Sequence, residues 1–159
     1  MDFNQNTMHP AKTFKSLTII HLALLAGQAI FVVVTLAATH NKFYNSNYTG
    51  DAFYFIVPVM AVIGLAASGL LFKQQLAKAK QAETVSAKLA VYTTASIIKF
   101  ALMEAPALFG IVVFFITGNL YYLVFPGLLM LSFLMQRPGK QRVTEQLELS
   151  ATEAMELDN

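Results

Sequence analysis

The stretch Lys99-Phe-Ala-Leu-Met-Glu104-Ala-Pro-Ala-Leu-Phe-Gly110 decides how this chain folds. It lies in an apolar run that continues to Ile116, and Glu104 is the lone carboxylate within that run. A carboxylate at the centre of a membrane-spanning helix costs about 2.5–3.5 kcal/mol on insertion scales. We therefore expect Glu104 to be hydrogen-bonded, protonated or used in a function.

The composition around this stretch is that of a membrane protein. Hydrophobic residues make up 56% of the 159 residues and charged residues only 13%, whereas a soluble domain carries about 25% charged residues. The net charge of +2 does not indicate a nucleic-acid partner. The chain has no Cys, and His9, His21 and His40 are too scattered to hold a metal ion. No catalytic motif or cofactor-binding motif is present, so we expect a non-enzyme whose main partner is the lipid bilayer.

The fold class predicted from the sequence is an all-α membrane protein with a single four-helix transmembrane domain over residues 16–138. A polar N-terminal tail over 1–15 precedes this domain, and an acidic, disordered tail over 139–159 follows it. The Lys-rich stretch over 73–92 contains good helix formers and predicts a cytoplasmic helical loop. The four predicted spans are about 17–38, 53–72, 97–116 and 120–135.

The distribution of basic residues predicts the orientation of these spans. With the N-terminus inside, every Lys and Arg except Lys42 falls on the inner side of the membrane. Because Lys and Arg concentrate in cytoplasmic loops, both termini are predicted to be cytoplasmic.

An internal repeat relates the first and third spans. Residues 18–31 and 96–109 share six of 14 positions when they are aligned without a gap. This predicts a duplicated helical hairpin, with both copies entering the membrane from the same side. The alignment pairs Ala26 with Glu104 and His21 with Lys99.

Two functional readings of Glu104 follow from this arrangement. If the first and third spans touch, Gln28 or His21 could reach the carboxylate, because the two spans run in parallel at similar depth. Glu104, Gln28 and His21 are then candidate ion- or proton-binding residues. Alternatively, a protonated Glu104 is hydrogen-bonded to one of them or to a backbone carbonyl and holds the helices together. Pro106 weakens the helix beside Glu104 by freeing the carbonyl of Leu102.

Other side chains are predicted to pack the helices or to lie at the membrane surface. Small residues allow close helix approach, and those of the second span that share one face are Ala61, Gly64 and Ser68. Lys99 is predicted to extend to the lipid headgroups, with Tyr121 and Tyr122 as interfacial anchors.

The segment Glu104-Ala-Pro-Ala-Leu-Phe-Gly110-Ile-Val-Val resembles the carboxylate helix of rotary ATPase proteolipid (c) subunits. The resemblance implies that Glu104 is an ion carrier. The chain departs from that family because its first span lacks a Gly-rich stripe and because its carboxylate lies on the first helix of a hairpin. Its charge distribution also places the hairpin loops outside, whereas the proteolipid has its polar loop in the cytoplasm.

Taken whole, the chain is similar to an uncharacterised bacterial family of small four-span membrane proteins. The similarity rests on the basic middle loop, the Ala-Leu-x-Glu-x-Pro-Ala-Leu-Phe helix at 101–109 and the Thr-Gly-Asn turn at 117–119. It implies a location in the bacterial cytoplasmic membrane and no known activity. We expect a non-enzymatic scaffold or a subunit of a membrane complex or homo-oligomer. The alternative expectation is a proton or cation carrier that uses Glu104.

Overall fold

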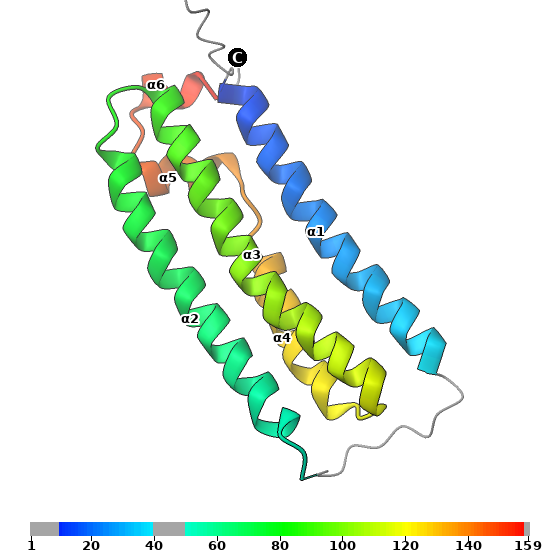
Figure 1. Cartoon of the computed structure of the whole chain (residues 1–159). Helices are drawn as coiled ribbons and strands as arrows, with labels where there is room; N and C mark the ends of the chain where they lie inside the picture. Colours follow the sequence, from blue (N-terminus) through cyan, green and yellow to red (C-terminus); the bar gives the residue numbers. More distant parts are fainter. Residues whose placement is uncertain (1–9, 40–49, 158–159) are drawn as a thin grey trace, which may run out of the picture.

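The computed structural model describes residues 10–39 and 50–157, and every regular element in these ranges is an α-helix (Figure 1). The all-helical fold predicted from the sequence is therefore confirmed. The helices are α1 (Pro10–Thr39), α2 (Phe53–Lys80), α3 (Val85–Thr117), α4 (Tyr121–Met135), α5 (Lys140–Leu147) and α6 (Ala151–Met155).

The first three helices are long and apolar enough to cross a membrane, and α4 is a shorter apolar helix. Large apolar side chains cover their outer faces, for example Ile19 (66% exposed) and Val33 (64%) on α1 and Val62 (66%) on α2. The buried face of α1 instead holds polar residues, including His21 and Gln28. Apolar surface on this scale is excluded from water, so this is the structure of an integral membrane protein.

Three of the helices extend beyond the spans predicted for them. Residues 10–15, predicted as part of a polar tail, form the first turns of α1, while residues 1–9 and Lys42 lie outside the described residues. The predicted basic stretch over 73–92 is helical at both ends, because α2 continues to Lys80 and α3 begins at Val85. The hydroxyl of Thr84 caps α3 by accepting a hydrogen bond from the N–H of Ala87 at 3.2 Å.

Helix α3 is the centre of the bundle and packs against α1, α2 and α4. It runs in the same direction as α1, and α4 returns antiparallel beside it (Figure 1). Gly118 ends α3 with a positive φ of 68°, and its N–H donates to the carbonyl of Phe114 at 2.7 Å. The side chain of Asn119 then accepts a hydrogen bond from the N–H of Tyr121 at 3.0 Å, which starts α4. A tight turn therefore occupies the predicted position 117–119.

The C-terminal segment is ordered, so the prediction of a disordered tail over 139–159 is wrong for residues 140–157. Helices α5 and α6 fold back over the end of the bundle where α2 and α3 are joined (Figure 1). We call residues 140–157 the C-terminal cap. Four of its apolar side chains are buried in the same core as Leu17 of α1 and Leu89 of α3, namely Val143, Leu147, Leu149 and Leu157. These apolar residues, and not the acidic residues between them, determine the structure of the segment.

Ion pairs also tie the C-terminal cap to the long helices. Lys80 at the end of α2 pairs with Glu148 at 2.5 Å, and Lys88 near the start of α3 pairs with Glu153 at 2.8 Å. The acidic residues of the cap thus face the basic ends of α2 and α3.

Candidate functional site

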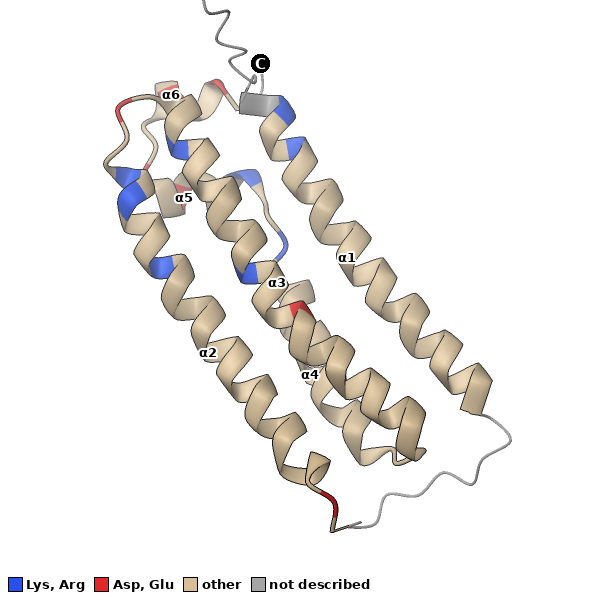
Figure 2. Cartoon of the chain, in the orientation of Figure 1, with Lys and Arg blue, Asp and Glu red and all other residues tan. Residues whose placement is uncertain are grey.

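Glu104 is the only acidic residue within α1 to α4, and it lies midway along α3 (Figure 2). It follows Phe100 by four residues and therefore lies on the side of α3 that faces α1, because Phe100 contacts His21 of α1. Its side chain is partly buried. Among the residues that the structure describes, no hydrogen bond or ion pair reaches the carboxylate.

His21 is completely buried between two phenylalanine rings. Its ring lies 5.1 Å from the ring of Phe100 on α3 and 4.4 Å from the ring of Phe133 on α4, with the latter pair stacked. Neither ring nitrogen of His21 has a hydrogen-bond partner in the described part of the chain. The side chain therefore packs as an aromatic ring in the core while its hydrogen-bonding capacity is unused.

Gln28 lies seven residues after His21 on the same face of α1 and is also buried, with no donor to its Oε1 atom. Helices α1 and α3 run in the same direction, so Gln28 is level with approximately Ala107, about 4.5 Å along the axis from Glu104 at 1.5 Å per residue. Both α1 residues thus face α3. However, neither is hydrogen-bonded to Glu104.

The small residues predicted to pack α2 share one buried face. Ala61, Gly64 and Ser68 are all buried, and the hydroxyl of Ser68 donates to the carbonyl of Leu65 at 2.7 Å. A methyl group added at Gly64 would lie 2.6 Å from the carbonyl oxygen of Leu102 and 2.7 Å from Cγ of Pro106. Helix α2 therefore lies close against α3 at the point where Pro106 frees that carbonyl.

A contact of the same kind, between a glycine and a proline, occurs between α3 and α4. A methyl group added at Gly110 would lie 2.7 Å from Cγ of Pro126 and 3.2 Å from the carbonyl oxygen of Tyr122, which Pro126 frees. In each contact a glycine of one helix lies against a proline of the next and the carbonyl four residues before it.

The two tyrosines predicted as interfacial anchors have different surroundings. Tyr121 is partly buried and stacks on Tyr54 of α2 with ring centroids 4.5 Å apart. Tyr122 is fully buried, and its hydroxyl donates to the carboxylate of Asp51 at 2.6 Å. Tyr122 therefore contacts the protein interior and not the lipid headgroups predicted for it.

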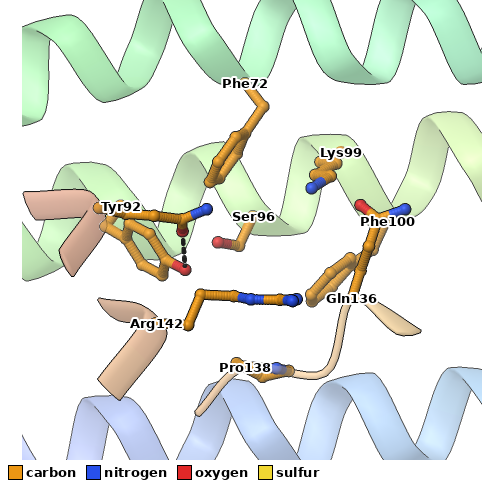
Figure 3. A pocket seen from close by; sticks show the side chains of 9 residues that line it. Phe72, Tyr92, Ser96, Lys99, Phe100, Gln136, Pro138 and Arg142 are labelled. Atoms are coloured by element: carbon orange, nitrogen blue, oxygen red, sulfur yellow. Dashed lines mark hydrogen bonds between the residues drawn. The ribbon is translucent and has the colours of Figure 1, made fainter. Parts of the chain in front are cut away.

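Lys99 lines a cavity at the opposite end of the bundle, between α3 and the start of the C-terminal cap (Figure 3). Its ammonium lies 4.4 Å from the centroid of the Phe72 ring. The cavity has a volume of about 20 Å³, which is room for one water molecule. Its polar lining consists of Tyr92, Ser96, Lys99, Gln136, Arg142 and Gln146. Lys99, which was predicted to extend to the lipid headgroups, thus has its side chain against this cavity.

Sequence reasoning missed this cavity because it treated the segment that contains Arg142 and Gln146 as disordered. One signal was available: Tyr92, Ser96 and Lys99 follow one another at intervals of four and three residues, which places three polar side chains on one face of α3. Arg142 and Gln146 show the same spacing on α5.

No protein-family model, curated protein or solved structure matches this chain. The resemblances found in the sequence are therefore still predictions. Within residues 10–39 and 50–157, no group of three or more His, Asp or Glu side chains is arranged to hold a metal ion.

Proposed function

We propose that this protein is a four-span membrane protein of the bacterial cytoplasmic membrane, a non-enzymatic scaffold or subunit of a membrane complex. Helix α4 supplies the fourth crossing because it returns along α3 toward the end of the bundle that carries the C-terminal cap. Its 15 residues span only about 22 Å at 1.5 Å per residue, so the bilayer thins locally around it.

The observation that carries this proposal is the carboxyl group of Glu104, which has no partner among the described residues. A polar group in hydrocarbon forms a hydrogen bond wherever one is accessible. Glu104 is partly exposed at the edge of the α1–α3 contact, so a donor on a helix of another chain can reach it. The partner is a second copy of this chain or a different membrane subunit.

The test compares Glu104→Leu with Glu83→Leu, which makes the same chemical change in the turn between α2 and α3. We expect the wild-type protein, extracted in mild detergent, to have a mass larger than one chain. Glu104→Leu removes every hydrogen-bonding atom of the side chain and should reduce this assembly to the single chain without unfolding it, and Glu83→Leu should leave it intact. A wild-type protein that is already a single chain in detergent and in nanodiscs would contradict the proposal.

A carrier of protons or small cations is the second candidate function. It is favoured by the unused hydrogen-bonding atoms of His21 and Gln28, which lie on the face of α1 toward α3. Three polar groups without partners would then line one path between the two helices, with Glu104 as the group that changes protonation.

Proton flux into liposomes separates the two candidates. If the wild-type protein conducts protons and Glu104→Gln abolishes conduction while it keeps its thermal stability, the scaffold reading fails. If neither form conducts and the variant loses only its partner or its stability, the carrier reading fails. Gln28→Leu provides a second variant, because a carrier path through α1 predicts that it slows the flux.

A further inference from the structure

The cavity beside Lys99 contains two positive charges and no negative charge in its lining. The ammonium of Lys99 and the guanidinium of Arg142 both line it and interact electrostatically with each other (Figure 3). Neither group forms an ion pair with a residue in the described ranges. Two cations held against one small cavity repel each other, and a bound anion would remove that repulsion.

Three acidic residues of the C-terminal cap have other partners. Glu145, three residues after Arg142, accepts a hydrogen bond from Nε2 of Gln141 at 2.8 Å. Glu148 and Glu153 of the C-terminal cap are paired with Lys80 and Lys88 on the long helices. Within the described residues, two lysines at this end of the bundle are thus paired with carboxylates, whereas Lys99 and Arg142 are not.

Hydrogen bonds hold Arg142 in position over the cavity. The hydroxyl of Tyr92 on α3 donates to the side chain of Gln146, one turn after Arg142, at 2.8 Å (Figure 3). Arg142 also donates from Nη1 to the carbonyl of Met135 at 3.1 Å. A guanidinium has five N–H donors, so several are left for a ligand. The Lys99 ammonium lies over the face of the Phe72 ring, which is not a conventional hydrogen-bond acceptor. Its N–H groups can therefore also donate hydrogen bonds to a ligand.

The cavity lies at the depth where lipid phosphates are found, if the chain is embedded as proposed above. Beyond Lys99, α3 is apolar as far as Ile116 except for Glu104, and the apolar run of α4 ends at Gln136. Both helices therefore leave the hydrocarbon at this level. Basic pockets at the cytoplasmic ends of membrane helices attract anionic headgroups.

We infer that this cavity is a binding site for a phosphate group, with Lys99 and Arg142 as its two cationic ligands. The cavity volume of about 20 Å³ admits one oxygen atom, so the rest of the phosphate lies at the mouth beside the exposed Arg142. The planar fork of Arg142 suits two phosphate oxygens, and Lys99 supplies a point charge behind them. A phospholipid headgroup and free phosphate present the same chemical group.

The experiment uses the full-length protein with two probes, inorganic phosphate and phosphatidylglycerol. Retention of phosphatidylglycerol against phosphatidylcholine is measured by native mass spectrometry, and inorganic phosphate binding by the shift in unfolding temperature. We expect Lys99→Gln and Arg142→Gln each to weaken binding about tenfold, the effect of losing one charged hydrogen bond. Lys78→Gln removes the same charge from an exposed position outside the cavity, and it should bind as the wild type does.

The two probes also identify the source of the phosphate. Retention of phosphatidylglycerol that depends on Lys99 and Arg142, without an effect of inorganic phosphate, identifies a lipid headgroup. Stabilisation by inorganic phosphate that both variants lose identifies a free phosphate. Lys99→Arg keeps the charge and should restore part of the binding, which separates a lost ligand from a damaged fold. The inference is overturned if neither probe binds the wild type, or if Lys78→Gln weakens binding as much as the two cavity variants do.

Discussion

Gly64 and Gly110 have no room for a side chain, because each lies against a proline and a carbonyl that the proline has released from its own helix. Proline in a helix normally leaves the carbonyl four residues earlier without its N–H partner. The backbone of a neighbouring glycine can approach such a carbonyl closely enough for weak Cα–H hydrogen bonds. Pro106 and Pro126 therefore mark two points where neighbouring helices are in close contact.

This close approach predicts that Gly64→Ala destabilises the protein by about 1–3 kcal/mol, the usual cost of overpacking a dense contact. The added methyl group would meet the backbone of α3, which cannot rotate away as a side chain can. Gly69→Ala is the matched control on the same helix, because nothing lies within 4 Å of its added methyl group. Thermal unfolding in detergent measures both variants, and equal unfolding temperatures would contradict the prediction.

The hydroxyl of Tyr122 gives a second prediction at the scale of single residues. It donates to the Asp51 carboxylate at 2.6 Å and so ties α4 to the start of α2. Tyr122→Phe should lower the free energy of unfolding by about 1.5–3 kcal/mol, the range for hydrogen bonds to charged groups. Tyr121→Phe is the comparison, since its hydroxyl donates to the carbonyl of Tyr54 over a longer distance of 3.4 Å and that acceptor carries no charge. The order of the two unfolding temperatures is the test, and a larger loss in Tyr121→Phe would refute the assignment.

At the scale of elements, the C-terminal cap is held by apolar burial and by charge. Contact with Lys88, together with hydrogen bonds from Ser150, holds the pKa of Glu153 at about 2. Hydrogen bonding to Lys80 likewise lowers the pKa of Glu148 below its usual value. Because the folded-state pKa of each carboxyl is depressed, protonation weakens the cap.

The cap should therefore loosen as the pH falls. Its ionic stabilisation is complete above the unfolded pKa of about 4.5 and is lost as the pH falls from there through about 2. Spin labels on Gln81→Cys and Thr152→Cys report the distance between the cap and the α2–α3 turn in a chain with no native Cys. We expect a narrow distance distribution above pH 4.5 that broadens toward pH 2.

Two variants test whether Glu153 causes this broadening. Glu153→Gln should show the broadened distribution already at neutral pH, because it cannot pair with Lys88 as a charge. Glu156→Gln removes an acid at the other end of α6, which has no ion pair to α3 in the described residues, and should behave as the wild type does. A distribution that stays narrow in Glu153→Gln would show that apolar burial alone holds the cap.

The helices of the bundle could be predicted from the sequence, and the cap could not. The apolar runs are long and uninterrupted, so their helical state follows from hydropathy alone. In the cap, Val143 and Leu147 form a single apolar stripe of one turn among charged residues, and Leu149 and Leu157 are isolated. Such a short segment becomes helical only because the ends of α1 to α3 offer a surface to cover, which a local pattern does not reveal.

The candidate site shows the same limit at the level of side chains. The sequence singles out Glu104, because one charge in an apolar run is visible without a structure. It places Gln28 and His21 on the facing helix, but whether they bond to Glu104 depends on the rotation of α1 about its axis. That rotation is set by packing, which buries His21 between Phe100 and Phe133 and leaves its nitrogens unbonded.

At the scale of the whole molecule, the dominant feature is the separation of charge along the bundle. Every Lys and Arg that the structure describes lies toward the end that carries the C-terminal cap (Figure 2). Asp51, in contrast, lies at the other end of the bundle, next to the first turn of α2. Since the inner leaflet attracts basic residues, this separation predicts one orientation in the membrane, with the cap inside.

Single cysteines test this orientation directly, because the chain has no Cys of its own. Ala52 and Gln81 are both exposed and lie at opposite ends of α2. A membrane-impermeant maleimide should label Ala52→Cys in intact spheroplasts and should label Gln81→Cys only after the membrane is opened. Labelling of Gln81→Cys in intact spheroplasts would show that the orientation is the opposite one, which places the cavity of Lys99 and Arg142 at the outer leaflet. The cap would then face the exterior, and the positive-inside bias would not be what orients this chain.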